Sequence, residues 1–243
     1  MADKVVHFEI IGDDSDALAK FYSELFSWHT ETFPDPPYTM VDTHAGHGIN
    51  GGIGSDPQGG NRVTFYVAVD DMQATLDQAE KLGGKVVMPI TELPMVKLAM
   101  FTDPQGNLVG IVFNDPAQEG GGVSSGKNPA ISWFEVFGTD ARKLADFYSA
   151  LFGWTVEFGE AQGDMVYGQV DAKESGIGGG IGSSSNVPSY TTVYAEVDDL
   201  QRYVDHAEQL GAKTMMGPQS MGTVSVAMFA DPAGNMFGVY KMN

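Results

Sequence analysis

The chain has 243 residues, with 13 lysines and arginines, 32 aspartates and glutamates and a formal net charge of −19. Basic residues this sparse build no basic patch, which excludes nucleic acid and an anionic membrane surface as partners. The absence of cysteine excludes disulfides, thiolate metal sites and cysteine nucleophiles. No apolar run reaches the roughly 18 residues of a membrane span and no apolar leader opens the chain, so we expect a soluble, cytoplasmic protein.

The first predicted elements are a strand and an amphipathic helix. Residues 4–11 are rich in β-branched and aromatic side chains, which indicates a strand. The run Gly12-Asp-Asp-Ser15 supplies helix-capping side chains, and apolar residues then recur at helical spacing from Ala17 to Phe26. Short strands broken by glycine-rich turns are predicted at 38–44 and 47–54.

A second group of elements follows the same plan. It begins with a strand at 62–69 and a helix from about 71 to 82, which ends at Gly83-Gly84. The later predicted strands lie near 85–88, 96–102 and 107–113. Short strands in succession after each helix favour antiparallel connections over a doubly wound parallel sheet, so the pattern predicts an α+β fold.

The whole pattern then occurs again. Phe21-Tyr22 and Leu25-Phe26-Ser-Trp28 return as Phe147-Tyr148 and Leu151-Phe152-Gly-Trp154, and Asp70-Asp71 returns as Asp198-Asp199. The turn Asp103-Pro-Gln-Gly-Asn107 returns as Asp231-Pro-Ala-Gly-Asn235. A repeat this long indicates a duplicated domain. We expect four βαβββ motifs, with approximate limits 1–60, 61–115, 129–186 and 187–243. They form two domains, 1–115 and 129–243, joined by a flexible linker at 116–128.

These motifs, in this order and present twice, resemble the vicinal-oxygen-chelate superfamily, which includes glyoxalase I, bleomycin-resistance proteins and extradiol dioxygenases. The resemblance covers nearly the whole chain apart from the linker. It implies that the βαβββ motifs pair and that curved mixed sheets form a cup in each domain. It also implies a small-molecule ligand and metal ligands on the first and last strand of each motif.

The ligand positions implied by the resemblance do not carry a metal-binding set. They fall on His7 and Trp133, on Thr64 and Thr192, on Gly110 and Gly238, and within Gly51-Gly-Ile53 and Gly179-Gly-Ile181. A catalytic divalent ion needs about three protein ligands, and one imidazole does not supply them. We therefore expect neither a metal nor another cofactor.

The remaining polar positions are the candidates for function. Glu9 and Glu135 each lie two residues after His7 or Trp133, on the same strand face, where a partly buried carboxylate suits acid–base chemistry. The alternative is a carboxylate bonded to a neighbouring backbone group. His7 has three possible roles, as a lone metal ligand, a general base or a residue of the pocket wall. Tyr66 and Tyr194 share a strand face with Thr64 and Thr192. These tyrosines would stack a planar ligand or serve as core aromatics.

Two other features are weaker candidates. His44 and His47 lie three apart in a predicted hairpin, where histidines are more often solvated than bound to metal. The glycine-rich segments 48–54 and 176–182 lead into no helix, so they lack the helix N-terminus of a phosphate loop. Methionines such as Met100 and Met228 would suit an adaptable apolar pocket or an ordinary core.

The sequence therefore predicts a metal-independent protein that binds an apolar or aromatic small molecule in one or both cups. The residues expected to contact the ligand are His7, Glu9, Thr64, Tyr66, Trp133, Glu135, Thr192 and Tyr194. A second hypothesis is a lyase, isomerase or hydroxylase-type enzyme with Glu9 or Glu135 as general base, and a third is a metalloenzyme with displaced ligands. We expect a monomer or a homodimer.

Overall fold

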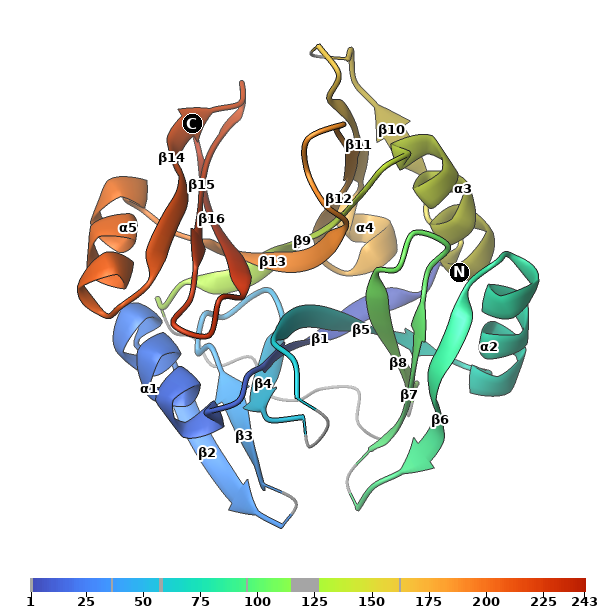
Figure 1. Cartoon of the computed structure of the whole chain (residues 1–243), viewed down its shortest axis with the longest axis horizontal. Helices are drawn as coiled ribbons and strands as arrows, with labels where there is room; N and C mark the ends of the chain where they lie inside the picture. Colours follow the sequence, from blue (N-terminus) through green and yellow to red (C-terminus); the bar gives the residue numbers. More distant parts are fainter. Residues whose placement is uncertain (1, 36, 57–58, 95, 115–126, 162) are drawn as a thin grey trace. The chain divides into compact units, whose positions relative to one another are not determined.

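The computed structural model describes residues 2–35, 37–56, 59–94, 96–114, 127–161 and 163–243. Within these ranges the first repeat folds as two βαβββ motifs (Figure 1). The first motif contains β1 (Lys4–Ile11), α1 (Ser15–Phe26), β2 (His29–Pro34), β3 (Pro37–Asp42) and β4 (Asn50–Gly54). The second contains β5 (Arg62–Val69), α2 (Met72–Lys81), β6 (Lys85–Glu92), β7 (Lys97–Thr102) and β8 (Leu108–Phe113).

The second repeat follows the same order with one additional helix, α4. Its first motif contains β9 (Ala130–Gly138), α3 (Ala141–Phe152), β10 (Val156–Phe158), β11 (Val166–Val170), α4 (Ala172–Ser175) and β12 (Gly178–Ser183). Its second contains β13 (Tyr190–Glu196), α5 (Leu200–Gln209), β14 (Lys213–Ser220), β15 (Val224–Ala230) and β16 (Met236–Met242). The predicted α+β class with four βαβββ motifs is therefore confirmed.

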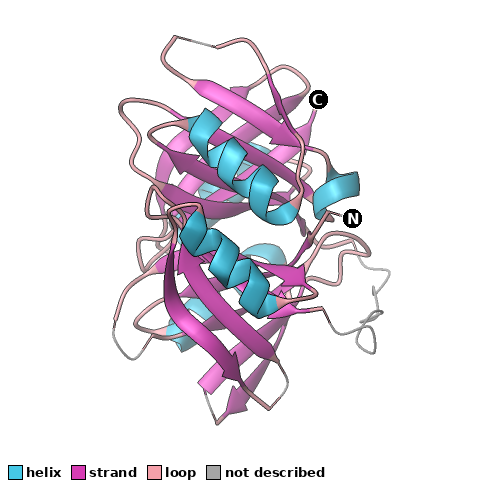
Figure 2. Ribbon diagram, turned by 90° about the vertical axis from the view of Figure 1, so that its right-hand side faces the viewer, coloured by secondary structure: helices cyan, strands magenta, loops and turns pink. Residues whose placement is uncertain are grey.

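Local chemistry explains where the four long helices begin. An aspartate caps each of them and accepts a hydrogen bond from the backbone N–H three residues later, which satisfies a donor that the helix leaves unpaired. These caps are Asp14, Asp71, Asp140 and Asp199. Each helix then packs its apolar face on the strands of its own motif (Figures 1 and 2).

The strands form two mixed eight-stranded sheets, one for each repeat. In every motif the first strand pairs next to the last one, which gives the four-strand orders β2-β3-β4-β1, β6-β7-β8-β5, β10-β11-β12-β9 and β14-β15-β16-β13. β1 is parallel to β4, β5 to β8 and β13 to β16. The antiparallel pairs are β2–β3, β3–β4, β6–β7, β7–β8, β10–β11, β11–β12, β14–β15 and β15–β16. This order places the first and last strands side by side in each motif.

The two compact units of the structure do not coincide with the two sequence repeats. One compact unit, here unit 1, comprises Met1–Val6, Thr64–Gly121 and Phe134–Thr191, and unit 2 comprises His7–Val63, Gly122–Trp133 and Thr192–Asn243. Each unit thus combines one motif of the first repeat with one of the second. The expected domain limits remain a prediction, and most of the expected linker, residues 116–126, lies outside the described residues.

Buried hydrogen bonds join the two motifs inside each unit. In unit 2 the Tyr22 hydroxyl of α1 donates to Asp231 Oδ2 at 2.9 Å, and in unit 1 the Tyr148 hydroxyl of α3 donates to Asp103 Oδ2 at 2.9 Å. The helix and turn motifs that reveal the duplication therefore bind each other crosswise, each helix to the turn of the other repeat. Two tryptophans act in the same way, because Trp28 Nε1 donates to the carbonyl of Pro129 and Trp154 Nε1 to that of Asp3.

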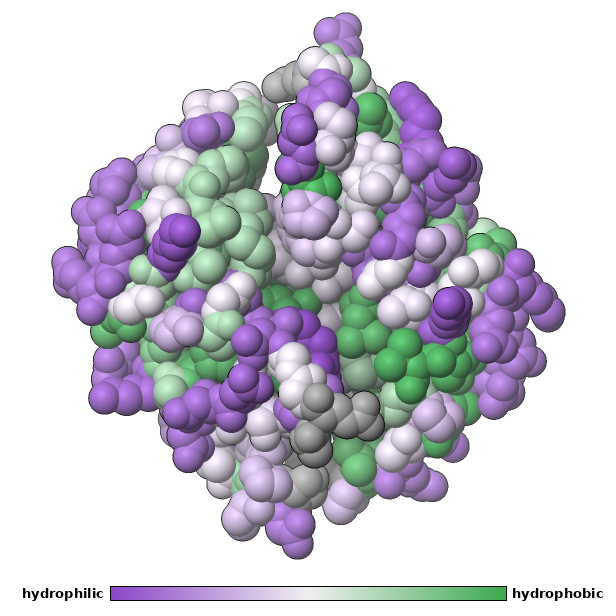
Figure 3. Space-filling view, in the orientation of Figure 1, coloured by the Kyte–Doolittle hydropathy of each residue, from purple (hydrophilic) through white to green (hydrophobic). Residues whose placement is uncertain are grey.

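The surface agrees with the acidic composition. Hydrophilic side chains cover the outer side of α5 and of α2 (Figure 3). Apolar side chains gather over the β6–β8 region of the same view, and the exposed apolar residues there are Val87, Met88, Leu93, Val96 and Phe113. Among the described residues, none of the helices has the length and apolarity needed to cross a membrane.

Candidate functional site

The first strand of each repeat carries a buried carboxylate. Glu9 on β1 is 9% exposed and lies opposite Gly52 of β4 in the parallel pair. Glu135 on β9 is 6% exposed. Burial of a carboxylate is costly unless hydrogen bonds compensate it. Each carboxylate and its hydrogen-bond partners form a group, here named the Glu9 group and the Glu135 group.

The Glu9 group consists of His7, Glu9 and Tyr38 and lies within unit 2. The Tyr38 hydroxyl donates to Glu9 Oε1 at 3.4 Å, and the Tyr38 hydroxyl oxygen lies 3.1 Å from His7 Nε2. Tyr38 comes from β3, and its ring covers Gly52, where a Cβ would collide with the phenol. Gly52 is therefore required for the tyrosine to reach the carboxylate.

Burial sets the protonation states of this group. His7 is densely surrounded by protein, and this burial lowers its pKa from 6.5 to about 4, so the imidazole is neutral at pH 7. The pKa of Tyr38 is raised well above 10, first by burial and then by the negative charge and hydrogen bond of Glu9. The Tyr38 hydroxyl has a single proton and donates it to Glu9, so the tautomer of His7 that completes this arrangement donates from Nε2 to the Tyr38 oxygen.

The Glu135 group consists of Glu135, Tyr167 and Tyr190 and lies within unit 1. Tyr167 donates to Glu135 Oε1 at 2.9 Å and Tyr190 donates to Oε2 at 2.6 Å. The Tyr190 ring also stacks on Phe137, with centroids 5.4 Å apart and planes at 4°. Tyr167 on β11 covers Gly180 just as Tyr38 covers Gly52. Both carboxylate oxygens therefore hold a phenol donor at short distance.

The predicted threonines and tyrosines form a second repeated arrangement. Thr64 donates to the carbonyl of Leu108 at 2.6 Å, and Thr192 donates to that of Met236 at 2.7 Å. Tyr66 covers Gly110 and Tyr194 covers Gly238, in each case opposite the glycine in a parallel strand pair. Their hydroxyls contact methionine sulfur, at 3.7 Å in Met100 and 3.4 Å in Met228.

Trp133 and the hairpin histidines lie in a different polar environment within unit 2. The Trp133 ring is 6.5 Å from that of Tyr240, whose hydroxyl donates to Glu196 Oε2 at 3.3 Å. His47 Nε2 lies 3.1 Å from the same carboxylate oxygen. His44 Nε2 is 3.1 Å from Asp42 Oδ2, and its ring stacks on His29 at 5.4 Å.

The structure thus brings His7 and Glu9 together but joins them through a residue that the sequence did not single out. Tyr38, Tyr167 and Tyr190 were all missed. The signal for the first two is a tyrosine on the strand antiparallel to a glycine-rich strand, because a bare glycine in a buried strand leaves space that a ring fills. Tyr190 gives no such signal, since its counterpart in the first repeat is Arg62.

The residues present do not fit the divalent metal that the fold implies. Tyrosine rings cover all four glycines at the implied positions, Gly52, Gly110, Gly180 and Gly238. Both threonine hydroxyls donate to backbone carbonyls, and the single imidazole contacts a phenol. Across the ranges that the structure describes, no three His, Asp or Glu side chains are grouped so that they could hold a metal ion.

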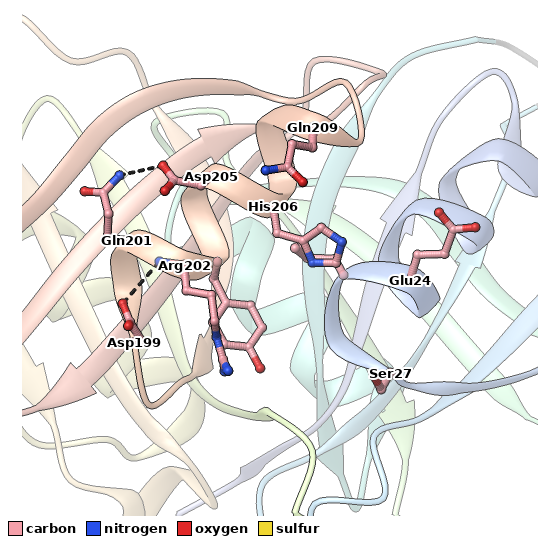
Figure 4. A pocket seen from close by; sticks show the side chains of 10 residues that line it. Glu24, Ser27, Asp199, Gln201, Arg202, Asp205, His206 and Gln209 are labelled. Carbon is pink, nitrogen blue, oxygen red and sulfur yellow. Dashed lines mark hydrogen bonds between the residues drawn. The ribbon is translucent and has the colours of Figure 1, made fainter.

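A separate open cleft of about 700 Å³ lies between α1 and α5 of unit 2 (Figure 4). His206 and Arg202 face it from α5, and Glu24 faces it from α1. Arg202 forms an ion pair with Asp198, with 2.6 Å between Nη2 and Oδ1, and its guanidinium carbon lies 4.9 Å from the centroid of the Tyr203 ring. The cleft shares no residue with the Glu9 and Glu135 groups.

Comparison with known proteins identifies the family. The model described as "Glyoxalase/Bleomycin resistance protein/Dioxygenase superfamily" matches residues 4–111 and 130–239, and the chain belongs to this superfamily. The chain is 29% identical to a putative glyoxylase, CFP32, of Mycobacterium tuberculosis, over 94% of this chain and 90% of the relative. It is 28% identical to the anthracycline biosynthesis protein DnrV of Streptomyces peucetius, over 97% and 92%.

Solved structures share the fold at lower identity. A 2,2',3-trihydroxybiphenyl 1,2-dioxygenase from Sphingomonas wittichii aligns with a TM-score of 0.66 and 16% identity, covering 99% of this chain and 91% of the dioxygenase. An Mn(II)-bound glyoxalase from Novosphingobium aromaticivorans aligns with a TM-score of 0.65 and 18% identity, covering 99% and 81%. These likenesses establish the fold alone.

Proposed function

We propose that this protein binds an apolar or aromatic small molecule without a metal ion, with the Glu9 and Glu135 groups as its polar contact points. The observation that carries the proposal is the Glu135 group, in which a buried carboxylate holds two phenols at 2.9 and 2.6 Å. Such a group is fixed before any ligand arrives, and fixed polar groups orient a ligand at low entropic cost.

Metal independence is supported by the chemistry at the implied ligand positions. A metal would have to replace the tyrosine rings over Gly52, Gly110, Gly180 and Gly238, and would find one imidazole already in contact with Tyr38. In place of a metal ion, the phenols and carboxylates would make the polar contacts with the ligand. Membership of a superfamily that includes bleomycin-resistance proteins supports small-molecule binding as the general function.

An aromatic ligand is supported by the tyrosines Tyr38, Tyr167 and Tyr190, which offer both a ring and a hydroxyl. The name of the relative DnrV, an anthracycline biosynthesis protein, supports including polycyclic aromatic compounds among the candidates.

The test is calorimetric titration of chelator-treated protein with a panel of planar aromatic compounds, after elemental mass spectrometry of the same sample. At least one compound should bind, and Glu135→Gln should weaken its binding by about tenfold, the effect of one charge-assisted hydrogen bond. Glu80→Gln, on the exposed side of α2, is the matched control and should leave affinity unchanged. Near-stoichiometric transition metal that disappears in His7→Ala would overturn metal independence.

The second candidate function is an enzyme of the lyase, isomerase or hydroxylase type, with Glu9 as general base. The contact of Glu9 with Tyr38, and of Tyr38 with His7, favours Glu9 over Glu135 in this role. Both oxygens of Glu135 already accept short hydrogen bonds, which leaves them less available to a substrate proton. Turnover that Glu9→Gln abolishes while binding is retained would establish catalysis.

A further inference from the structure

Glu196, the last residue of β13, is the centre of another polar group within unit 2. Its Oε2 atom lies 3.1 Å from His47 Nε2, 3.3 Å from the Tyr240 hydroxyl and 3.4 Å from the Ser132 hydroxyl. The two hydroxyls are 2.9 Å apart, and the Trp133 ring lies 6.5 Å from that of Tyr240. These five residues are named the Glu196 group here, and none of them belongs to the Glu9 group or the Glu135 group.

The duplication shows that the fold does not require this group. In the parallel pair of β13 and β16, Glu196 lies opposite Tyr240. The equivalent pair of β5 and β8 places Ala68 opposite Val112. An apolar pair is therefore sufficient for the sheet at this position, and the stability of the fold does not explain why unit 2 has a carboxylate and a phenol there.

The contacts of Glu196 use only one of its two oxygens. All three contacts are made by Oε2, whereas Oε1 accepts no hydrogen bond from any residue that the structure describes. Within the same ranges no lysine or arginine forms an ion pair with Glu196, and His47 is charged only when it is protonated. The Glu196 side chain is 37% exposed. An accessible carboxylate oxygen without a permanent positive partner favours a cation that carries N–H donors.

The neighbouring rings favour an organic cation over a metal ion. An ammonium group is attracted to the face of a tryptophan or tyrosine ring, and the rings of Trp133 and Tyr240 lie side by side with their planes at 55°. A metal ion would need about three protein ligands. Glu196 and His47 supply two, and no set of three His, Asp or Glu side chains that could hold a metal occurs in the described parts of the chain.

We propose that the Glu196 group binds the protonated primary amine of an organic ligand. Oε1 of Glu196 accepts an N–H of the ammonium group, while the contacts at Oε2 hold the carboxylate in place. The rings of Trp133 and Tyr240 contact the carbon substituent of the amine. The net charge of −19 attracts such cations to the protein. This inference goes beyond the proposed function, because it assigns a ligand class to a group that the proposed function does not use.

The experiment uses benzylamine as the probe and benzyl alcohol as its uncharged analogue. Both are titrated at pH 8 into the full-length protein labelled with 15N, and the indole N–H signals of the three tryptophans are followed by NMR. Trp28 and Trp154 serve as internal references, because their Nε1 atoms donate to backbone carbonyls. Trp133→Phe assigns the third signal. Benzylamine should shift the Trp133 signal and bind about fivefold more tightly than benzyl alcohol, the effect of a partly exposed ion pair.

Two variants and one change of conditions test the role of the charge. Glu196→Gln keeps the side-chain shape, and it should lower the affinity for benzylamine about fivefold without changing that for benzyl alcohol. Glu80→Gln, at an exposed position of α2, changes the net charge equally and should leave both affinities unchanged. In the wild type, added NaCl should weaken the binding of benzylamine alone, a measurement that does not depend on the folding of a variant.

Several results would overturn the amine site. They are equal affinities for the two probes in the wild type, an affinity for benzylamine that Glu196→Gln leaves unchanged, and the lack of a saturable shift of the Trp133 signal. Shifts of the Trp28 and Trp154 signals as large as that of Trp133 would also contradict it, because they would show binding away from Glu196. None of these results overturns the proposed function, which is tested separately by the aromatic panel and Glu135→Gln.

Discussion

The Glu9 and Glu135 groups share a carboxylate, a tyrosine and a glycine in the same arrangement, but they differ in their third polar side chain. In both, a carboxylate on the first strand meets a tyrosine that covers a glycine of the last strand of the motif. In the Glu135 group a second phenol, Tyr190, completes the contacts at 2.6 Å. In the Glu9 group the tyrosine instead contacts a neutral imidazole at 3.1 Å.

This difference separates what the fold requires from what each site does. The glycine and the covering tyrosine occur in both repeats, so they belong to the scaffold. The third member, His7 or Tyr190, occurs in one repeat only. Tyr190 binds the carboxylate directly, whereas His7 contacts the tyrosine that binds it. The following predictions test this contrast.

The largest expected effect is the pH dependence of stability contributed by His7. Its pKa is 6.5 in the unfolded chain and about 4 in the folded one, so between these values the unfolded state binds more protons. The stability due to neutral His7 is complete above pH 6.5 and is lost as the pH falls to 4, a loss of about 3 kcal/mol. His7→Phe should remove this part of the pH dependence, measured by urea unfolding at a series of pH values.

The matched control is Trp133→Phe, which should leave the pH slope as it is in the wild type. Asp3 acts in the opposite direction, because burial and then the charge of Asp70 raise its pKa to about 6, but its contribution is the same in all three proteins. A wild-type slope that persists in His7→Phe would show that His7 is not held neutral.

An effect of similar size distinguishes the two carboxylates. Glu135→Leu removes the acceptor of two short phenol bonds and should cost about 3 kcal/mol in the free energy of unfolding. Glu9→Leu removes the acceptor of a longer and weaker hydrogen bond, 3.4 Å from Tyr38, and should cost less than Glu135→Leu. Urea denaturation at pH 7 measures both, and equal losses would contradict the idea that Glu135 is the more firmly held carboxylate.

The smallest effect concerns the glycines under the tyrosines. A Cβ at Gly52 would collide with Tyr38 and one at Gly180 with Tyr167, so Gly52→Ala and Gly180→Ala should each cost about 2 kcal/mol through overpacking. Gly217→Ala in unit 2 and Gly159→Ala in unit 1 are matched controls, because no atom lies within 4 Å of the added carbon. They should change stability by less than about 0.5 kcal/mol, and a similar loss in all four variants would refute a specific tyrosine contact.

Most elements of the fold could be predicted because their side-chain patterns are local. The strand at 4–11, the strand at 62–69 and the helix that ends at Phe26 are confirmed at or near their predicted limits. The sequence did not reveal β2, His29–Pro34, whose side chains are mostly polar and exposed and which ends in a proline. The short helix α4 was also missed, because four residues are too few to show a helical period.

Only part of the candidate site could be predicted from the sequence. Glu9 and Glu135 were found because equivalent positions in a repeat can be compared directly. Tyr38 and Tyr167 were missed because their importance depends on which strand lies beside the glycines, and register is a property of the folded sheet. Tyr190 depends on a contact between β9 and β13, two strands that are more than fifty residues apart in the chain.

The hydrogen bonds of Tyr22 with Asp231 and of Tyr148 with Asp103 each join one repeat to the other. The position of a crossover in a chimera with a relative therefore decides whether both partners of each pair come from the same parent. A chimera with its crossover in the linker takes each helix from one parent and its aspartate from the other, so it tests both buried pairs at once. A chimera that keeps β1–β4 with β13–β16 inherits each pair whole from a single parent. Library designs for this chain therefore gain most from two crossovers, one after each repeat's first motif.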